Sequence, residues 1–138
     1  MSLALPKPTR SLPKARQRIR AVSKRANASL HSQAWRLCSA LVRNRAAYRC
    51  EVSGVLGTEA HHGFGKKAHP SVKYDGRNLF WLSHEVHNKA HEDRGWFREE
   101  MIRILGVVQY EALAMRATAT RDQDSPSDVI AAAKQGRF

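Results

Sequence analysis

Histidines in the middle of the chain have a spacing suited to metal-assisted hydrolysis. His61 and His62 are adjacent, and His87 and His91 follow four residues apart. Imidazole is the commonest metal ligand, and a neutral imidazole is also a general base near neutral pH. Hydrolysis of a phosphodiester needs both a cation to take up charge on the phosphate and a base to deprotonate the attacking water. The motif therefore has the residue types that metal-assisted hydrolysis needs, although a His-x-x-x-His pair alone is a weak signal.

The spacing also predicts how these side chains point. Residues four apart on a helix lie one turn apart on the same face, so His87 and His91 can share one ion. Adjacent strand residues point to opposite sides, so one of His61 and His62 can turn toward a metal and the other toward a substrate. We interpret the remaining histidines as surface or satisfied core residues: His31, His69 and His84.

At these residues the chain resembles the HNH endonucleases, and most of all the colicin-type DNases, which also read Glu-x-His-His and end His-x-x-x-His. The matching segments are Glu59-Ala60-His61-His62 and His87-Asn88-Lys89-Ala90-His91. The resemblance covers residues 48–93. It implies an α+β fold in which a ββα-metal (HNH) unit, about residues 57–93, packs with flanking helices. It further implies a metal-dependent endonuclease that nicks one DNA strand per event.

The resemblance also implies roles for individual residues. His62 matches the general base on the first strand, and Asn78 matches the asparagine that holds the intervening loop and positions the base. Glu59 is a supporting residue. The metal ligands match the other three histidines of the motif, His61, His87 and His91. We expect the nearby basic residues to contact DNA: Lys66, Lys67, Arg77 and Lys89. For Lys66 and Lys67, an ordinary solvated basic turn is an equally good interpretation.

An all-histidine ligand set predicts one divalent metal ion but does not identify the metal. Imidazole suits Zn²⁺, Ni²⁺, Mn²⁺ or Co²⁺ better by softness than Mg²⁺, whereas HNH proteins often use Mg²⁺. Many HNH proteins also hold a structural zinc on two Cys-x-x-Cys knuckles. Such closed zinc sites need four ligands. The matching positions here are Cys50-x-x-Ser53 and Ser83-x-x-Val86, so we expect no structural zinc.

Positive charge is concentrated at the N-terminal end of the chain. The net charge is +12, and residues 1–50 hold twelve Lys or Arg and no acidic residue. Such a segment is typical of a polyanion binder, because neutralising phosphates releases counterions. A solubilising tail or attraction to acidic lipids would also explain the charge alone. Next to the histidine motif, we interpret DNA as the partner.

Periodicity predicts the elements that must position the motif. We expect a basic flexible arm over 1–27, a nuclease domain over 28–117 and a polar C-terminal tail over 118–138. The tail is expected to be mobile, apart from a candidate short helix over 127–134. The domain's expected elements are helices over 29–47, 84–93, 96–105 and 107–117, a hairpin of 48–52 with 58–62, and a strand over 78–82.

The same sequence bears on compartment and origin. It has no apolar stretch of about 18 residues that could cross a membrane. It shows no signal peptide, and its two cysteines fit a reducing compartment, so we expect a cytoplasmic protein without a membrane partner. The pattern around Trp96-Phe97-Arg98 and Gly106 resembles the lambdoid-phage recombination nucleases. That resemblance implies a phage or prophage origin, with other phage DNA-processing proteins, or a second copy in a homodimer, as candidate partners.

Two other functions are compatible with the sequence. A basic DNA-binding or architectural protein could hold a purely structural metal on the same histidines, with no role for His62 or Asn78. A secreted nuclease toxin would need an export or receptor-binding region, of which the sequence shows no sign.

Deleting residues 1–27 should weaken DNA binding and flatten its dependence on salt. The deletion removes eight positive charges and no proposed catalytic group. Each lost phosphate contact should lower the slope of log K against log[salt] by about 0.9 on duplex DNA. Binding is measured from low to moderate salt in a His62→Ala background, so that DNA is not consumed. An unchanged slope would show that the arm does not touch DNA.

Overall fold

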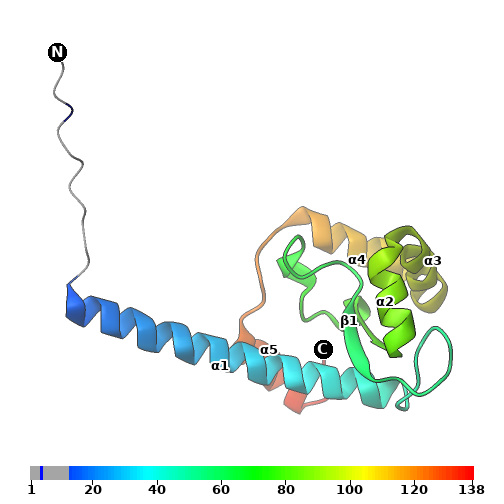
Figure 1. Ribbon diagram of the computed structural model, residues 1–138, viewed down its shortest axis with the longest axis horizontal. Helices are drawn as coiled ribbons and strands as arrows, with labels where there is room; N and C mark the ends of the chain where they lie inside the picture. Colours follow the sequence, from blue (N-terminus) through cyan, green and yellow to red (C-terminus); the bar gives the residue numbers. More distant parts are fainter. Residues whose placement is uncertain (1–3, 5–12) are drawn as a thin grey trace.

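The computed structural model describes residue 4 and residues 13–138 of an α+β protein that is mostly helical. A long helix, α1 (Lys14–Arg45), runs along one side, and its N-terminal half projects beyond the rest of the protein (Figure 1). One small sheet lies against the C-terminal half of α1. Among the described residues, no helix combines the length and apolar character that crossing a membrane requires.

Helix α1 begins well before its expected start at Ser29. Residues 14–27, which we expected to lack regular structure, form its N-terminal half; the earlier part of the expected arm lies outside the described residues, apart from residue 4. Between Lys14 and Arg45 the chain has no glycine or proline and is rich in Ala and Arg, which are strong helix formers. Apolar periodicity marks only the half of the helix that packs, so it could not reveal the projecting half.

The sheet pairs β1 (Glu59–His62) with β2 (Leu79–Leu82) in antiparallel register. His61 lies opposite Phe80, and His62 lies opposite Leu79. Because side chains alternate along a strand, these two pairs face opposite sides of the sheet. His61 contacts side chains of α2 (His84–Glu92) and α3 (Arg94–Leu105), whereas His62 contacts α1.

The expected hairpin of residues 48–52 with 58–62 is wrong. In the described part of the chain, the only pairing there is an isolated bridge between Arg49 and Leu56. Tyr48 has a φ of 66°, which interrupts an extended strand, and the chain turns again at Gly54. Residues 59–62 pair instead with β2, after a loop that contains two 3₁₀ helices, η1 (Pro70–Val72) and η2 (Gly76–Asn78).

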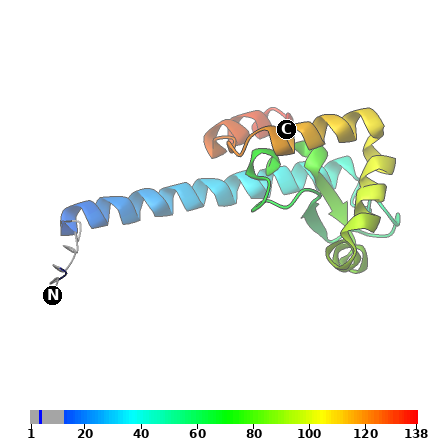
Figure 2. The same cartoon turned by 90° about the horizontal axis from the view of Figure 1, so that it is seen from above.

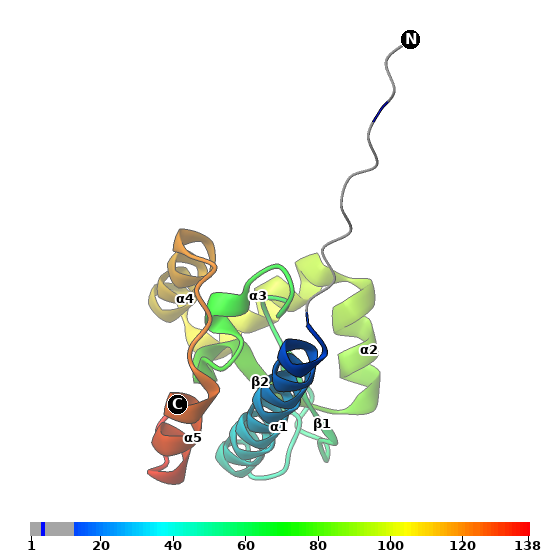
Figure 3. The same cartoon turned by 90° about the vertical axis from the view of Figure 1, so that its left-hand side faces the viewer.

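Each face of the sheet belongs to its own hydrophobic cluster. Phe80 and Leu82 face α2, α3 and α4 (Val107–Ala119), while Leu79 faces α1 and α5 (Pro126–Lys134). Figure 3, viewed nearly along α1, shows α1 and α5 on one side of the sheet and α3 and α4 on the other. The sheet therefore lies between two helical layers, which hold His61 and His62 apart.

Local signals place the helices that follow β2. The Ser83 hydroxyl accepts the backbone N–H of Val86 at 3.3 Å, which confirms it as the cap of α2. Asp93 caps α3 in the same way, through the backbone N–H of Trp96 at 3.0 Å. Gly106 ends α3 with a φ of 80°, a conformation that glycine adopts readily. Because α2 starts immediately after β2, its histidines lie beside β1.

The candidate short helix near the C-terminus is present as α5, and it packs on α1. Figure 2 shows the two helices side by side. Val129 and Ile130 are each 8 % exposed and belong to one hydrophobic cluster with Cys38 of α1. The sequence predicted this helix but not its packing on α1, because so short an apolar pattern is a weak signal. Residues 126–134 are instead part of the packing around α1.

Ile130→Ala should lower the free energy of unfolding by about 2 to 4 kcal/mol, because it leaves a cavity between α5 and α1. Met115→Ala is the control, since Met115 is 71 % exposed on α4 and its truncation should change stability little. Urea unfolding followed by circular dichroism measures both. Equal stability of the two variants would show that α5 does not pack on α1 in solution.

Candidate active site

Three of the motif histidines meet between β1 and α2. The ligand nitrogens of His61, His87 and His91 all lie within 4.8 Å of one another, and Nε2 of His87 is 3.0 Å from Nε2 of His91. Nitrogens that share a tetrahedral zinc ion at about 2.0–2.1 Å lie about 3.3 Å apart. Small side-chain movements would therefore bring all three onto one ion. These histidines could form a metal site.

Glu59 orients one of these ligands from the strand beside it. Its Oε2 accepts the Nδ1–H of His87 at 2.9 Å, and its Oε1 accepts from Nδ1 of His84 at 3.1 Å. Since the proton of His87 is then on Nδ1, its Nε2 presents a lone pair to the cluster. Burial acts to raise the pKa of Glu59, but the hydrogen bonds from His84 and His87 outweigh it and lower that pKa. Such a carboxylate fixes the ligand ring and raises its basicity.

His61 is held in the neutral form that binds metals. It is 7 % exposed, and its ring meets that of Phe97 edge to face at 4.9 Å. Burial, together with His87, His91 and His62, lowers the pKa of His61 to about 3. Because a protonated imidazole cannot coordinate a cation, this low pKa favours metal binding near neutral pH.

His62 lies on the other side of the strand and has a defined tautomer. Its Nε2 is 3.0 Å from the carbonyl oxygen of Lys73, which can only accept, so Nε2 carries the proton and Nδ1 has the lone pair. The ring of Trp35 on α1 stacks on it at 4.7 Å. Burial lowers the pKa of His62 to about 4; the Lys73 carbonyl opposes this shift and the charges of Lys66 and Lys73 add to it. His62 is therefore a neutral base with one lone pair available.

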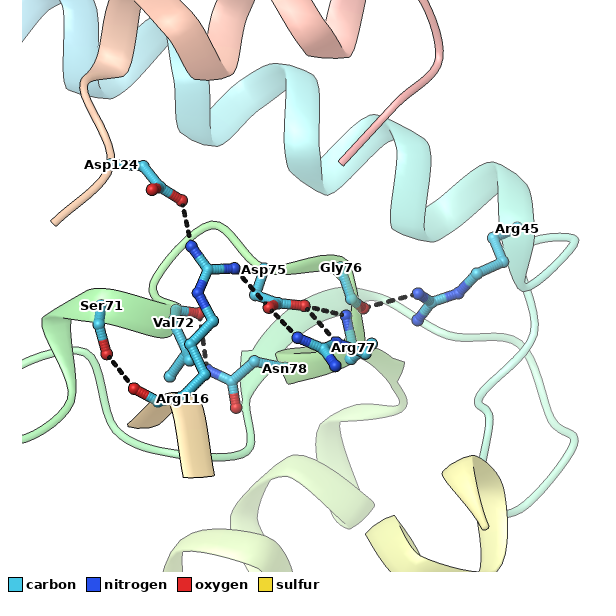
Figure 4. A network of polar contacts seen from close by, with 9 residues as sticks. All are labelled: Arg45, Ser71, Val72, Asp75, Gly76, Arg77, Asn78, Arg116 and Asp124. Atoms are coloured by element: carbon cyan, nitrogen blue, oxygen red, sulfur yellow. Dashed lines mark hydrogen bonds and ion pairs between the residues drawn. The ribbon is translucent and has the colours of Figure 1, made fainter. Parts of the chain in front are cut away.

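Asn78 closes the loop that carries Lys73. Its side chain is fully buried and donates to the carbonyl oxygens of Phe64 and Val72, both at 3.0 Å. Its Oδ1 accepts the backbone N–H of Phe64 at 2.6 Å. Figure 4 shows Asn78 lying beneath this loop. Because the loop supplies the carbonyl that orients His62, Asn78 acts on His62 through the loop and makes no direct contact with it among the hydrogen bonds of the described residues.

A buried carboxylate anchors the end of the same loop (Figure 4). Asp75 accepts from Arg77 at 2.8 Å and from Arg116 of α4 at 2.7 Å, and Arg116 also pairs with Asp124 at 2.8 Å. Burial acts to raise the pKa of Asp75, but these arginine contacts outweigh it and lower that pKa. Arg77, which we expected to contact DNA, is thus held in an ion pair that stabilises the loop.

The lysines expected to contact DNA are exposed. Lys66 and Lys67 lie in the turn after β1, where Arg121 donates to the carbonyl oxygens of Lys67 and Ala68 at 3.2 and 3.1 Å. Lys66 is close enough to His62 to lower its pKa. Lys89 lies on α2 with its Nζ 4.2 Å from the centroid of the Trp96 ring. Of these side chains, Lys66 has the clearest relation to the candidate base.

The sequence did not reveal two residues that position His62. Trp35 lies on α1 beside the apolar stripe and not on it, and a large aromatic residue in that position was the signal that could have found it. Lys73 acts through its main-chain carbonyl. Since every residue has such a group, nothing in the sequence could mark it.

No protein-family model, curated protein or solved structure matches the chain. A function is therefore inferred from the geometry of the site. The site combines three imidazoles around one point with a fourth imidazole, His62, whose Nδ1 lone pair is free. These are the groups that metal-assisted hydrolysis requires.

Zn²⁺ or Mn²⁺ should bind to the histidine cluster, and His87→Ala and His91→Ala should each weaken that binding. Glu59→Gln should lower metal affinity by about 10- to 100-fold, because it removes the carboxylate behind His87. Glu85→Gln, an exposed acidic residue of the same helix, is the matched control and should bind as the wild type does. Calorimetric titration measures all four variants. Unchanged affinity in both histidine variants would exclude α2 as a source of ligands.

Proposed function

We propose that the chain is a metal-dependent endonuclease that hydrolyses DNA phosphodiester bonds. The observation that carries the proposal is that adjacent residues of β1 have different surroundings. His61 lies in a three-histidine cluster, and His62 is a neutral base on the opposite side of the strand. The order β1, β2, α2 and the loop held by Asn78 also fit the ββα-metal unit of the HNH endonucleases. Sequence resemblance and geometry thus support the same function.

In the proposed reaction His62 is the general base. Its Nδ1 takes a proton from a water molecule in line with the scissile phosphorus. The imidazolium that forms keeps its original proton on Nε2 and donates it to the Lys73 carbonyl oxygen at 3.0 Å. This hydrogen bond keeps the ring in the productive tautomer and stabilises the charged form. Trp35 restricts the orientation of the ring from its stacked position.

One divalent ion, which could be Mg²⁺, Mn²⁺, Zn²⁺ or Ni²⁺, would be held by His61, His87 and His91 and would stabilise negative charge on the phosphate oxygens. Three neutral ligands leave the ion's full charge and its remaining coordination positions for phosphate and water. Closed structural zinc sites have four protein ligands. Among the described residues the cluster has three, which favours a catalytic site over the structural metal of a DNA-binding protein.

Charge supports DNA as the substrate. The whole net charge of +12 comes from residues 1–50, and the projecting half of α1 carries six basic residues and no acidic one. Lys66 and Lys73, in the loop after β1, add positive charge close to His62. One such site engages one strand at a time, so we propose nicking as the elementary reaction.

The proposal is tested by incubating supercoiled plasmid with the protein and each divalent ion, with and without EDTA. Nicked circles should appear with at least one of the ions and disappear with EDTA. His62→Ala should lower the cleavage rate by about 10² to 10⁴. Metal binding and DNA binding should change little, because in this scheme His62 contacts neither the metal ion nor the DNA backbone. His31→Gln is the matched control, because His31 makes no hydrogen bond or ring contact with His62 among the described residues, and glutamine can retain its hydrogen bond to the Tyr74 hydroxyl.

Equal cleavage by His62→Ala and the wild type would remove His62 as the base. Loss of metal binding in His62→Ala would mean that the roles of His61 and His62 are exchanged. Metal binding without cleavage of any DNA would favour the architectural alternative.

A further inference from the structure

A small pocket lies on the α1 side of the sheet, beside the candidate base. Its volume is about 260 Å³, and it is lined by Trp35, Arg36, Ser39, Ala40, Arg43 and Trp81. Trp35 contacts both the pocket and the candidate base, since its ring also stacks on His62. Pockets for drug-sized ligands start at roughly 300 Å³. This pocket therefore suits a smaller group.

Three of the residues that line the pocket carry buried polar atoms without hydrogen-bond partners. Ser39 Oγ, Arg43 Nε and Trp81 Nε1 are buried and have no hydrogen-bond partner within residues 13–138. The arginine and tryptophan nitrogens can only donate, and the serine hydroxyl can donate. Buried polar groups without partners are uncommon, and three of them belong to residues of one pocket. A ligand rich in acceptor atoms would complement them.

The pocket is also positively charged. Arg36 is exposed and has no ion-pair partner in the described part of the chain, and the guanidinium of Arg43 lies 5.0 Å from the centroid of the Tyr48 ring, not against a carboxylate. Glu51, which binds the β2 backbone nearby, is engaged by Arg45 at 3.1 Å. Two guanidinium groups are thus available for an anion.

The pocket lies at the end of a basic stripe on α1. At 100° per residue, the stripe's members fall within about 40° of one another around the helix axis. They are Lys14, Arg18, Arg25, Arg36 and Arg43. The face opposite this stripe is the one that packs on the sheet and α5 through Ala34 and Cys38. The stripe is therefore exposed from Lys14 to Arg36, whereas Arg43 at its end is partly buried beside Trp81.

We propose that the pocket binds one backbone phosphate of the DNA strand that is cut, between the guanidinium groups of Arg36 and Arg43. The strand then continues along the basic stripe of α1. This inference deepens the proposed function and rests on it, because it places the bound strand next to His62. The pocket is too small for a whole nucleotide, and His62 already occupies one face of Trp35, so the ligand group is a phosphodiester and not a stacked base.

The test measures binding of a labelled DNA duplex by fluorescence anisotropy, from low to moderate salt, in EDTA and in a His62→Ala background. Arg36→Ala and Arg43→Ala should each weaken binding and lower the slope of log K against log[salt] by about 0.9. Arg36→Lys retains the charge and should retain the slope. Lys134→Ala removes one exposed charge from α5 and is the control; its slope should stay at the value of the parent protein.

Tryptophan fluorescence provides a second readout, because two of the three tryptophans line the pocket. In a Trp96→Phe background, DNA should change the emission, and combining Arg36→Ala with Arg43→Ala should abolish that change. Inorganic phosphate at matched ionic strength is the comparison. If phosphate alone produced the same change and displaced DNA, the pocket would be a site for the free anion, and the proposal would be overturned.

The outcome for the pocket can be separated from the outcome for catalysis. Arginine variants that bind DNA as Lys134→Ala does would overturn the pocket even if the wild type nicks plasmid. If no ion supports cleavage but both arginine variants lower the salt slope, the pocket stands as a DNA-binding site and the nuclease proposal falls. Circular dichroism and thermal unfolding of each variant exclude loss of fold as the cause of weakened binding.

Discussion

The antiparallel pairing of β1 with β2 determines the geometry on which the site depends. A two-stranded sheet is only marginally stable in water, and here both faces are covered by helices. The outer edge of β2 is also satisfied: Glu51 binds the backbone N–H of Trp81 at 2.8 Å, and Arg45 binds the carbonyl of Leu79 at 2.6 Å. Side-chain alternation along β1 then directs His61 and His62 to opposite sides of the sheet. The candidate base and one metal ligand are therefore adjacent in the sequence.

The two halves of the site are supported by different parts of the fold. The histidine cluster depends on β1 and on α2, which Ser83 starts immediately after β2. His62 depends on the loop held by Asn78 and on Trp35 of α1. A change in α1 can therefore affect the base and leave the metal ligands in place. In the proposed enzyme the same helix would bind substrate and orient the base.

The sequence predicted what local chemistry and chain spacing determine. The caps Ser83 and Gly106, the strand before α2 and the meeting of the motif histidines follow from such signals. It failed where packing between distant segments decides: the partner of residues 59–62, the docking of α5 and the position of Trp35. Arg77 is an intermediate case, because its charge was evident but its ion pair with Asp75 forms only when the loop folds.

Helix α1 has a further consequence for the size of the DNA segment that the protein can cover. An uninterrupted helix rises 1.5 Å per residue, so Lys14 lies about 30 Å from Trp35 along the axis. At 3.4 Å per nucleotide, a strand that follows the helix would pass about nine nucleotides over that distance. The DNA segment covered by the protein would extend mainly to one side of the cleaved bond. The length of helix α1 would thus set the length of the DNA contact and the side of the cleaved bond to which it extends.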